Sequence, residues 1–339
     1  MNQMRPIERL PGATCPRVAV IVPAYGVAHL VGEALASLQA QTLTDWECVV
    51  VDDGAPDDVA GAVAPFLSDS RITLLETDNA GVSTARNRAI AATRAPLVAL
   101  LDGDDLLRPH YLARTTAALD ADPAARLVTV NARIFGAVPR ERLCFQSQQG
   151  TGDGRRGSLA DVIDRSFGVY IGSTFRRADF DAAGGFDPAM THAEDFDLWV
   201  RLMLPGGHAL YLDEVLGDYR VRSKSASAAN QKMLKGNIQT FEKALAALPP
   251  GAPEVAVAEA MIAQNRRQLR FELAIDRVID GDRSALADLR ATAPDDLGPV
   301  WHASMLAWRV MPALAGPMLE HRRRANARGA GAPAEKATG

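Results

Sequence analysis

Cysteine is scarce in this chain, and no hydrophobic run is long enough to cross a membrane. The 339 residues include three cysteines, Cys15, Cys48 and Cys144, and no CxxC pair of the kind that holds zinc. Their odd number and uneven spacing are typical of a protein in a reducing compartment. No stretch of about 20 apolar residues could span a bilayer, and residues 1–16 lack the apolar core of a signal peptide. We therefore expect a cytoplasmic protein, or one that is peripheral at the cytoplasmic face of a membrane.

The chain also lacks an excess of positive charge and the usual phosphate-binding loops. Its formal net charge is −4, which predicts no nucleic-acid partner and requires any anionic ligand to be held by a local arrangement. No GxGxxG dinucleotide loop follows a predicted strand, and no GxxxxGKS or GxxxxGKT loop occurs. A Rossmann dehydrogenase or a P-loop enzyme would thus lack its phosphate cradle. A content of 47% hydrophobic and 23% charged residues is typical of globular proteins with one large or two modest domains.

The N-terminal part of the sequence alternates between short apolar runs and amphipathic segments. Residues 17–25 form a β-branched run ended by Pro23, as expected of a strand buried on both faces. Residues 28–41 carry apolar side chains at helical spacing. The alternation continues with expected strands at 46–51, 72–75 and 96–101 and expected helices at 57–67 and 82–92. This order predicts an α/β domain with a parallel sheet and covering helices.

Acidic residues follow two of the expected strands. Asp102-Gly103-Asp104-Asp105 comes directly after the run 96–101, and Asp52-Asp53 ends the run that begins at Trp46. Three carboxylates at one strand end repel one another unless a cation or a hydrogen-bonding ligand compensates them, and Mg²⁺ prefers oxygen ligands. Aspartate also forms turns and helix caps, which is the alternative interpretation. Because ligands of such sheets bind beyond the carboxyl ends of the strands, we expect the two acidic clusters to meet at one edge.

The pattern changes after Phe135. Residues 150–157 are rich in glycine and predict a mobile loop, and helical and extended segments resume from Ser158 to about Val221. Beyond about Ala228 the sequence is alanine-rich and helical by pattern, with breaks at Pro249-Pro250 and at 294–299. We expect a second, all-α module there, followed by a disordered tail.

Six short motifs follow one another between Val18 and about Ser227. They are Val18-Ala-Val-Ile-Val-Pro-Ala-Tyr25, Val50-Val-Asp-Asp-Gly54, Asn79-Ala-Gly-Val-Ser-Thr-Ala-Arg-Asn87, Leu101-Asp-Gly-Asp-Asp105, Gly184-Gly-Phe-Asp187 and Glu194-Asp195. In this order they resemble glycosyltransferase family 2. The resemblance implies a GT-A-type fold, which is a Rossmann-like mixed sheet with flanking helices, together with a nucleotide-sugar donor and inverting chemistry. It does not reach the C-terminal helical module.

The resemblance implies a nucleotide-sugar site at the strand ends. Asp53 would hydrogen-bond the uracil or another base, and Pro23 and Tyr25 would flank the nucleotide. Asp102, with Gly103 beside it, would face the ribose or the metal. The implied donor is a nucleotide sugar, with a UDP-sugar favoured.

The resemblance also implies a divalent metal, Mg²⁺ or Mn²⁺, at the aspartate (DXD) motif. Asp104 would be the ligand and Asp105 would assist it, while Arg86 would lie beside the nucleotide. The chain departs from the family at Gly26, where asparagine is usual, and at Arg222, where histidine is frequent. Arg222 could still bind the diphosphate through two hydrogen bonds.

The last motif supplies the expected proton acceptor. By the resemblance Asp195 is the general base, and Glu194 is the next candidate. Both residues open an amphipathic segment, so they should lie near a helix N-terminus, where the helix dipole favours ionised carboxylates. Capping alone is the structural alternative. Trp199 in the same segment is expected to pack its helix onto the sheet, with an aromatic platform for the acceptor as the alternative.

These features together predict an N-terminal extension at 1–16, a GT-A catalytic domain at 17–228, a helical module at 229–325 and a disordered tail at 326–339. The nucleotide-sugar half of the catalytic domain should reach about residue 135, and the acceptor half should follow. Apolar residues between Trp301 and Leu319 accompany arginines. They favour packing as a core, with peripheral contact to anionic lipid as the alternative.

The predicted activity is metal-dependent, inverting transfer of a sugar to a hydroxyl of a glycan or lipid-linked acceptor. No QxxRW motif follows Glu194-Asp195, which predicts one sugar per encounter rather than processive synthesis. A metal-dependent nucleotidyltransferase and a non-catalytic nucleotide-sugar-binding or assembly subunit are the alternatives. The presence of both Asp104 and Asp195 argues against the non-catalytic alternative.

Overall fold

The computed structural model describes residues 15–222, 230–294 and 297–321. The chain divides into two compact units. We call residues 1–135 and 141–220 the sheet unit, and residues 136–140 and 221–339 the helical unit.

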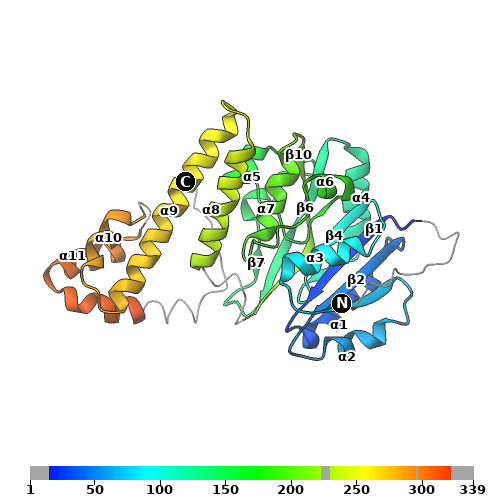
Figure 1. The fold of residues 1–339 in the computed structure, drawn as a ribbon, viewed down its shortest axis with the longest axis horizontal. Helices are drawn as coiled ribbons and strands as arrows, with labels where there is room; N and C mark the ends of the chain where they lie inside the picture. The colour runs from blue at the N-terminus through cyan, green and yellow to red at the C-terminus, as the bar shows by residue number, and fades with distance from the viewer. Residues whose placement is uncertain (1–14, 223–229, 295–296, 322–339) are drawn as a thin grey trace. The chain divides into compact units, whose positions relative to one another are not determined.

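The described residues of the sheet unit are organised around one ten-stranded sheet (Figure 1). Its strands lie in the order β3-β2-β1-β4-β9-β6-β10-β5, with β7 paired to β6 and β8 paired to β10. The first four strands in this order are parallel to one another, and β9 is antiparallel to β4 and to β6. The sheet is therefore mixed, which confirms what the resemblance implied. The wholly parallel sheet that the alternation of strands and helices predicted is wrong.

The parallel half is the part that the sequence alternation predicts. Its strands are β1 (Val18–Ala24), β2 (Trp46–Asp53), β3 (Ile72–Thr77) and β4 (Leu97–Leu100). Its helices are α1 (Ala28–Gln39), α2 (Val59–Val63), the 3-10 turn η1 (Ala64–Phe66) and α3 (Val82–Ala91), which packs against β1 and β2. The strands are buried almost throughout, which agrees with their continuous apolar runs.

Several boundaries in this half differ from expectation by a few residues, and those of β1 and β2 lie next to the acidic residues. β1 runs through Pro23 to Ala24 instead of ending at the proline. The pairing of β1 with β4 stops at Ile21 and Leu100, so the missing N–H of Pro23 breaks no hydrogen bond on that side. β2 takes in both Asp52 and Asp53, because β3 pairs with it as far as Asp53 and Thr77.

The second half of the sheet unit consists of shorter strands and helices around two long strands. The long strands are β6 (Ala125–Gly136) and β10 (His208–Val221). The short strands are β5 (Leu106–Leu107), β7 (Arg142–Leu143), β8 (Arg155–Gly157) and β9 (Thr174–Arg176). The helices are α4 (Tyr111–Ala121), α5 (Leu159–Ile163), α6 (Arg177–Ala182) and α7 (Glu194–Met203), with the 3-10 turn η2 (Gln146–Gln148).

The segment 150–157 is tied to the sheet, so its interpretation as a mobile loop is wrong. Its last three residues form β8, which pairs with β10. The Asp213 carboxylate accepts hydrogen bonds from the N–H groups of Gly150 and Gly152, and the Asp213 N–H donates to Asp153. The glycines here supply positive φ angles within an ordered turn.

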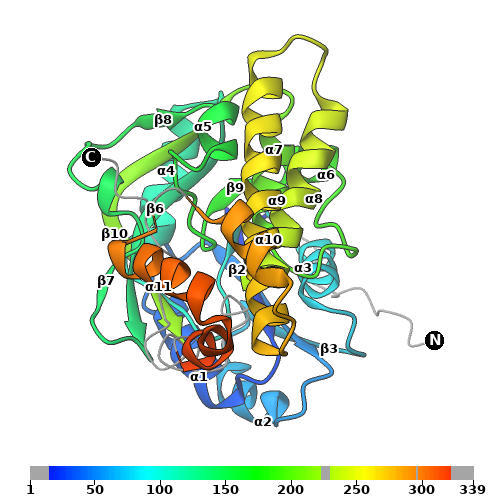
Figure 2. The same cartoon turned by 90° about the vertical axis from the view of Figure 1, so that its left-hand side faces the viewer.

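The helical unit confirms the expected all-α module (Figure 2). Its helices are α8 (Asn230–Ala247), α9 (Pro253–Ile279), α10 (Ala285–Thr292) and α11 (Pro299–Val310), followed by the 3-10 turn η4 (Pro312–Leu314). Trp301 packs on Phe271 of α9 with ring centroids 5.5 Å apart, and Trp308 packs on Trp301. The two tryptophans thus belong to a core within this unit.

No helix in the described ranges combines the length and the apolar character needed to cross a bilayer. The expected N-terminal extension lies outside the described residues apart from Cys15 and Pro16, and the expected tail lies wholly outside them.

Candidate active site

The two acidic clusters lie at the same edge of the sheet. β1 stands between β2 and β4, and all three strands run in the same direction, so Asp52-Asp53 and Asp102 leave the sheet at neighbouring carboxyl ends. Gly103 lies close to the end of β1. A Cβ atom at this glycine would come within 3.1 Å of the Pro23 carbonyl oxygen and 3.0 Å of Val27. A side chain at position 103 would therefore require Val27 or the backbone of Pro23 to give way slightly.

Asp53 connects β2 to the start of α3. Its buried carboxylate accepts hydrogen bonds from the N–H groups of Ala80 and Gly81, at 3.1 and 2.9 Å. Arg88 lies 3.8 Å from the same carboxylate. The Thr77 hydroxyl donates to Asp53 Oδ1 at 3.4 Å. A carboxylate has about four acceptor sites, so these contacts fix the side chain in place and leave limited capacity for a ligand.

Tyr25 offers an exposed aromatic surface next to this edge. It follows β1 directly, and 52% of its surface is exposed. Arg222 follows directly after β10, in the helical unit, and its predicted role stays a prediction.

Arg86 joins the acidic turn to the start of α7. Its guanidinium is 2% exposed and donates to Asp102 Oδ1 at 2.7 Å and to Glu194 Oε1 at 2.8 Å. A buried cation needs anionic partners of this kind, because the free energy that it loses on leaving water is otherwise not compensated. The two carboxylates raise the pKa of Arg86 despite its burial, which keeps the guanidinium charged. One arginine therefore connects two motifs that are 108 and 16 residues away from it in the sequence.

Asp195 lies beside this pair in the first turn of α7. Burial and the charge of Glu194 raise the pKa of Asp195 to about 6, against the opposing effects of Arg86, the Phe196 N–H and Arg165. The Phe196 N–H donates to Asp195 Oδ1 at 2.7 Å. A carboxylate with such a pKa is mostly ionised at neutral pH and still accepts a proton readily, as a general base requires.

Asp105 faces the interior of the sheet unit. Its Oδ1 accepts from the Arg220 N–H at 2.7 Å, and its Oδ2 accepts from the Tyr170 hydroxyl at 3.3 Å. Burial and the charges of Asp102 and Asp104 raise the pKa of Asp105 well above its ordinary value. Asp105 thus supports the acidic turn from within.

Asp104 is half-buried, and its carbonyl oxygen accepts from Arg220 Nε at 2.8 Å. The turn therefore presents hard oxygen donors with an excess of negative charge, which fits a divalent cation. Within the described ranges, no group of three or more acidic, histidine or cysteine side chains converges as a ready-made metal site. A metal here would complete its coordination with phosphate oxygens and water, as Mg²⁺ usually does.

Three residues near these groups were not predicted as site residues. Arg220 holds Asp105 and the backbone of Asp104, Tyr170 holds Asp105, and Arg165 lies over Phe196. One indication of Arg220 was present in the sequence, because this residue stands two positions before the predicted site residue Arg222 on an extended segment. Trp199 packs against Phe175 of β9 and is buried, which confirms that it packs α7 onto the sheet.

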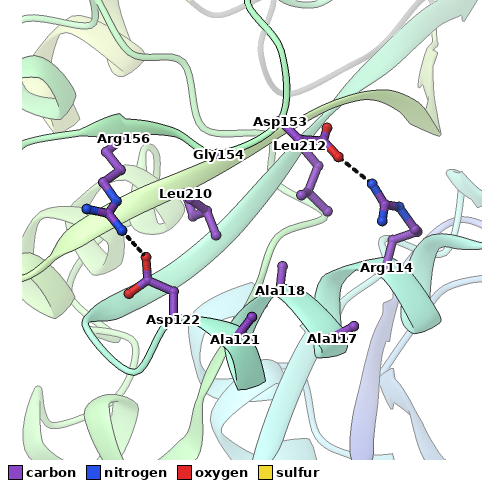
Figure 3. A pocket seen from close by; sticks show the side chains of 10 residues that line it. All are labelled: Arg114, Ala117, Ala118, Ala121, Asp122, Asp153, Gly154, Arg156, Leu210 and Leu212. Atoms are coloured by element: carbon purple, nitrogen blue, oxygen red, sulfur yellow. Dashed lines mark hydrogen bonds and ion pairs between the residues drawn. The ribbon is translucent and has the colours of Figure 1, made fainter.

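A pocket of about 360 Å³ lies elsewhere in the sheet unit (Figure 3). Alanines of α4 and two leucines of β10 face each other across it, and the ion pairs Arg156–Asp122 and Arg114–Asp153 lie at its two sides. None of the predicted site residues lines it.

Comparisons with known proteins agree with the family that the motifs resemble. Residues 19–183 match the family model described as glycosyl transferase family 2. The succinoglycan biosynthesis protein ExoU of Rhizobium meliloti is 28% identical over 280 residues, which are 78% of each chain. WfgD of Escherichia coli, a UDP-Glc:alpha-D-GlcNAc-diphosphoundecaprenol beta-1,3-glucosyltransferase, is 25% identical over 64% of this chain and 82% of its own. Some other curated relatives are matched over as little as 24% of their length.

Solved structures share the fold. S. aureus TarS 1–349 in complex with UDP-GlcNAc superposes with a TM-score of 0.62, at 18% identity over 82% of both chains. The mannosyltransferase PcManGT of Pyrobaculum calidifontis, in complex with GDP-Man and Mn²⁺, gives 0.57 at 21% identity over 93% of this chain and 84% of its own.

Proposed function

The chain is a glycosyltransferase of family 2, and from this premise we propose that it transfers a sugar, with inversion, from a UDP-sugar to a hydroxyl of a glycan or lipid-linked acceptor. The observation that carries the proposal is the contact of Arg86 with both Asp102 and Glu194. It brings the aspartate motif at the strand edge next to the carboxylates of α7. Donor and acceptor chemistry can then take place at one site.

The reaction we propose is a single displacement. The acceptor oxygen forms a bond to the anomeric carbon of the sugar, the bond from that carbon to the diphosphate breaks, and UDP leaves with the electron pair. Asp195 takes the proton of the acceptor hydroxyl as the new bond forms. Arg86 fixes Glu194, and with it the first turn of α7, relative to the acidic turn. A single sugar per encounter agrees with the absence of a QxxRW motif.

The donor site we propose is the edge formed by β1, β2 and the acidic turn. Tyr25 and Pro23 would flank the nucleotide, Asp53 would meet the base, and Asp102 with Gly103 would meet the ribose. The donor we favour is a UDP-sugar, because the name of WfgD, a relative in sequence, contains UDP-Glc. Among the proteins that share only the fold, TarS was solved with UDP-GlcNAc and PcManGT with GDP-Man.

We assign the metal to Asp104, with Asp105 supporting the turn from its buried position. A divalent ion bound there would neutralise the charge of the departing diphosphate. PcManGT, which shares the fold, was solved with Mn²⁺, and this is in keeping with the proposal.

Changing Asp104 to asparagine is expected to abolish the metal dependence of UDP binding. Calorimetry of UDP with the full chain should give much tighter binding with Mn²⁺ than with EDTA, and the variant should show the weak value under both conditions. Asp181→Asn, at an exposed aspartate of α6, is the matched control and should bind like the wild type. Equal UDP affinity of the wild type with Mn²⁺ and with EDTA would refute the metal assignment.

We also propose that α11 contacts the membrane that carries a lipid-linked acceptor. Trp301 and Trp308 point into the core of the helical unit, whereas Leu306 and Val310 are 64% and 79% exposed. Residues 299–324 contain four arginines and one glutamate in a chain of net charge −4. Exposed apolar side chains followed in the sequence by a run of arginines are typical of segments that bind an anionic lipid surface.

The membrane proposal predicts binding that weakens with salt. Full-length protein should sediment with vesicles of phosphatidylcholine and phosphatidylglycerol but not with phosphatidylcholine alone, because the contact depends on attraction between basic side chains and anionic headgroups. Added salt should reduce the sedimentation, because it screens this attraction. Aspartate at both Leu306 and Val310 should abolish the sedimentation. The control is Leu273→Asp, at an exposed leucine of α9, which should leave it unchanged. Sedimentation of the double variant at the wild-type level would refute the proposal.

A further inference from the structure

Backbone strain in the sheet unit gathers around the start of α7. Among the described residues, Arg165 and Ala193 are the two non-glycine residues with positive φ, at 63° and 60°. Ala193 directly precedes Glu194, the first residue of α7. Arg165 is far from Ala193 in the sequence and lies just after the end of α5. The left-handed region is unfavourable for a residue with a Cβ atom, and it occurs mostly just after helix C-termini and at functional sites.

Arg165 lies close to the predicted base. Its guanidinium carbon lies 4.3 Å from the centroid of the Phe196 ring, and Phe196 is the neighbour of Asp195. The charge of Arg165 acts on Asp195, and α5 packs against α7. The residue is exposed overall, while desolvation by the surrounding protein lowers the pKa of the guanidinium itself.

The position of Arg165 suits an acceptor better than a donor. The proposed donor site is formed by β1, β2 and the turn after β4, all in the first half of the sheet unit. Arg165 comes from the second half, on the helix that packs against the helix of the base. A stacked, planar guanidinium is pre-organised to bind an oxyanion through two hydrogen bonds, which an ammonium group does less well.

We propose that Arg165 forms an acceptor subsite that binds a phosphate or carboxylate of the acceptor and holds the attacking hydroxyl against Asp195. The proposal rests on the function of Asp195 proposed above. It predicts that the acceptor carries a negative group near the hydroxyl that is glycosylated. The left-handed residue also ends α5, where the Arg165 N–H donates to the Val162 carbonyl oxygen.

Arg165→Gly is the decisive variant, because glycine adopts positive φ without strain. It should be at least as stable to heat as the wild type, whereas Arg165→Ala keeps the strain and should be less stable. Affinity is measured by calorimetry for a short-chain alkyl GlcNAc-diphosphate and for a GlcNAc-terminated uronate oligosaccharide, with UDP and Mg²⁺ already saturating the donor site. Methyl GlcNAc is the neutral reference.

The expected result is that one anionic probe binds the wild type more tightly than methyl GlcNAc, and that Arg165→Gly weakens this binding by about 10- to 100-fold, the range for hydrogen bonds to charged groups. The probe that responds identifies the phosphate or the carboxylate as the ligand. Arg165→Lys should recover part of the affinity. Arg71→Ala, which removes an arginine stacked on Trp46, should have no effect on probe binding.

Three results would overturn the inference: no preference for either anionic probe, wild-type affinity in Arg165→Gly, or an equal loss for methyl GlcNAc, which would indicate a role independent of charge. UDP affinity in the presence of metal is recorded for every variant. If the wild type does not bind UDP in the presence of metal, the proposed function itself is refuted.

Discussion

Replacing Asp195 with asparagine is expected to lower kcat by about 10²-fold or more, the usual contribution of a general base. UDP affinity should stay close to that of the wild type, because the donor site lies at the strand edge. The amide has the shape of the carboxylate but cannot accept the proton. Steady-state kinetics of transfer, together with calorimetry of UDP, would separate the two effects.

The same assignment predicts the pH dependence. The pKa of Asp195 is raised to about 6, so the base is protonated below this pH and kcat/KM of the wild type should fall as the pH drops through it. Since burial and Glu194 disfavour the charged form in the folded protein, Asp195→Asn should be no less stable than the wild type at neutral pH. Wild-type turnover in Asp195→Asn would move the base elsewhere, with Glu194 the next candidate.

Replacing Arg86 with methionine is expected to destabilise the fold by about 3–5 kcal/mol, the cost of leaving buried charges without their partner. Asp102 and Glu194 would both lose the guanidinium that contacts them, at 2.7 and 2.8 Å. Transfer activity should be lost as well, since the acidic turn and α7 would no longer be joined. Urea unfolding followed by circular dichroism would measure the change in free energy of unfolding.

Arg88→Met on the same helix is the matched control for this result. Arg88 is 33% exposed and 3.8 Å from Asp53, so its loss should cost no more than about 1 kcal/mol. Adding Glu194→Gln to Arg86→Met should restore part of the stability, because one unpaired carboxylate is then neutral. Equal stability of the Arg86 and Arg88 variants would show that the buried contact has no structural role.

Much of the parallel half of the sheet could be predicted from the sequence. β1, β2 and β4 are continuous apolar runs, and α1 carries one apolar stripe, so periodicity identifies each element. β6 was not predicted, because its buried interior includes polar residues. Thr129 accepts from the Tyr170 N–H, and Asn131 bonds with the backbone of Phe145. These polar residues fit a core strand because residues far along the chain hydrogen-bond with them. The local sequence does not reveal those distant partners.

The individual residues of the candidate site could be predicted from the sequence, but the contacts that join them could not. The acidic residues at strand ends, and Glu194-Asp195 at a helix start, follow from position in the sequence. The link through Arg86 depends on how α7 is placed by the antiparallel half of the sheet, which periodicity does not determine. Arg165 gave no signal at all, since left-handed backbone favours glycine, asparagine and aspartate over arginine.

The most direct measurement for the proposed function is proton NMR of UDP-α-glucose, UDP-α-GlcNAc and UDP-α-galactose incubated with the full chain and Mn²⁺. Water replaces the acceptor in slow hydrolysis, so no acceptor has to be known in advance. The expected result is that one donor releases UDP and the β-anomer of its sugar first, before mutarotation, and that EDTA stops the reaction. Initial release of the α-anomer, or no consumption of any UDP-sugar by the folded protein, would contradict inverting transfer from a UDP-sugar.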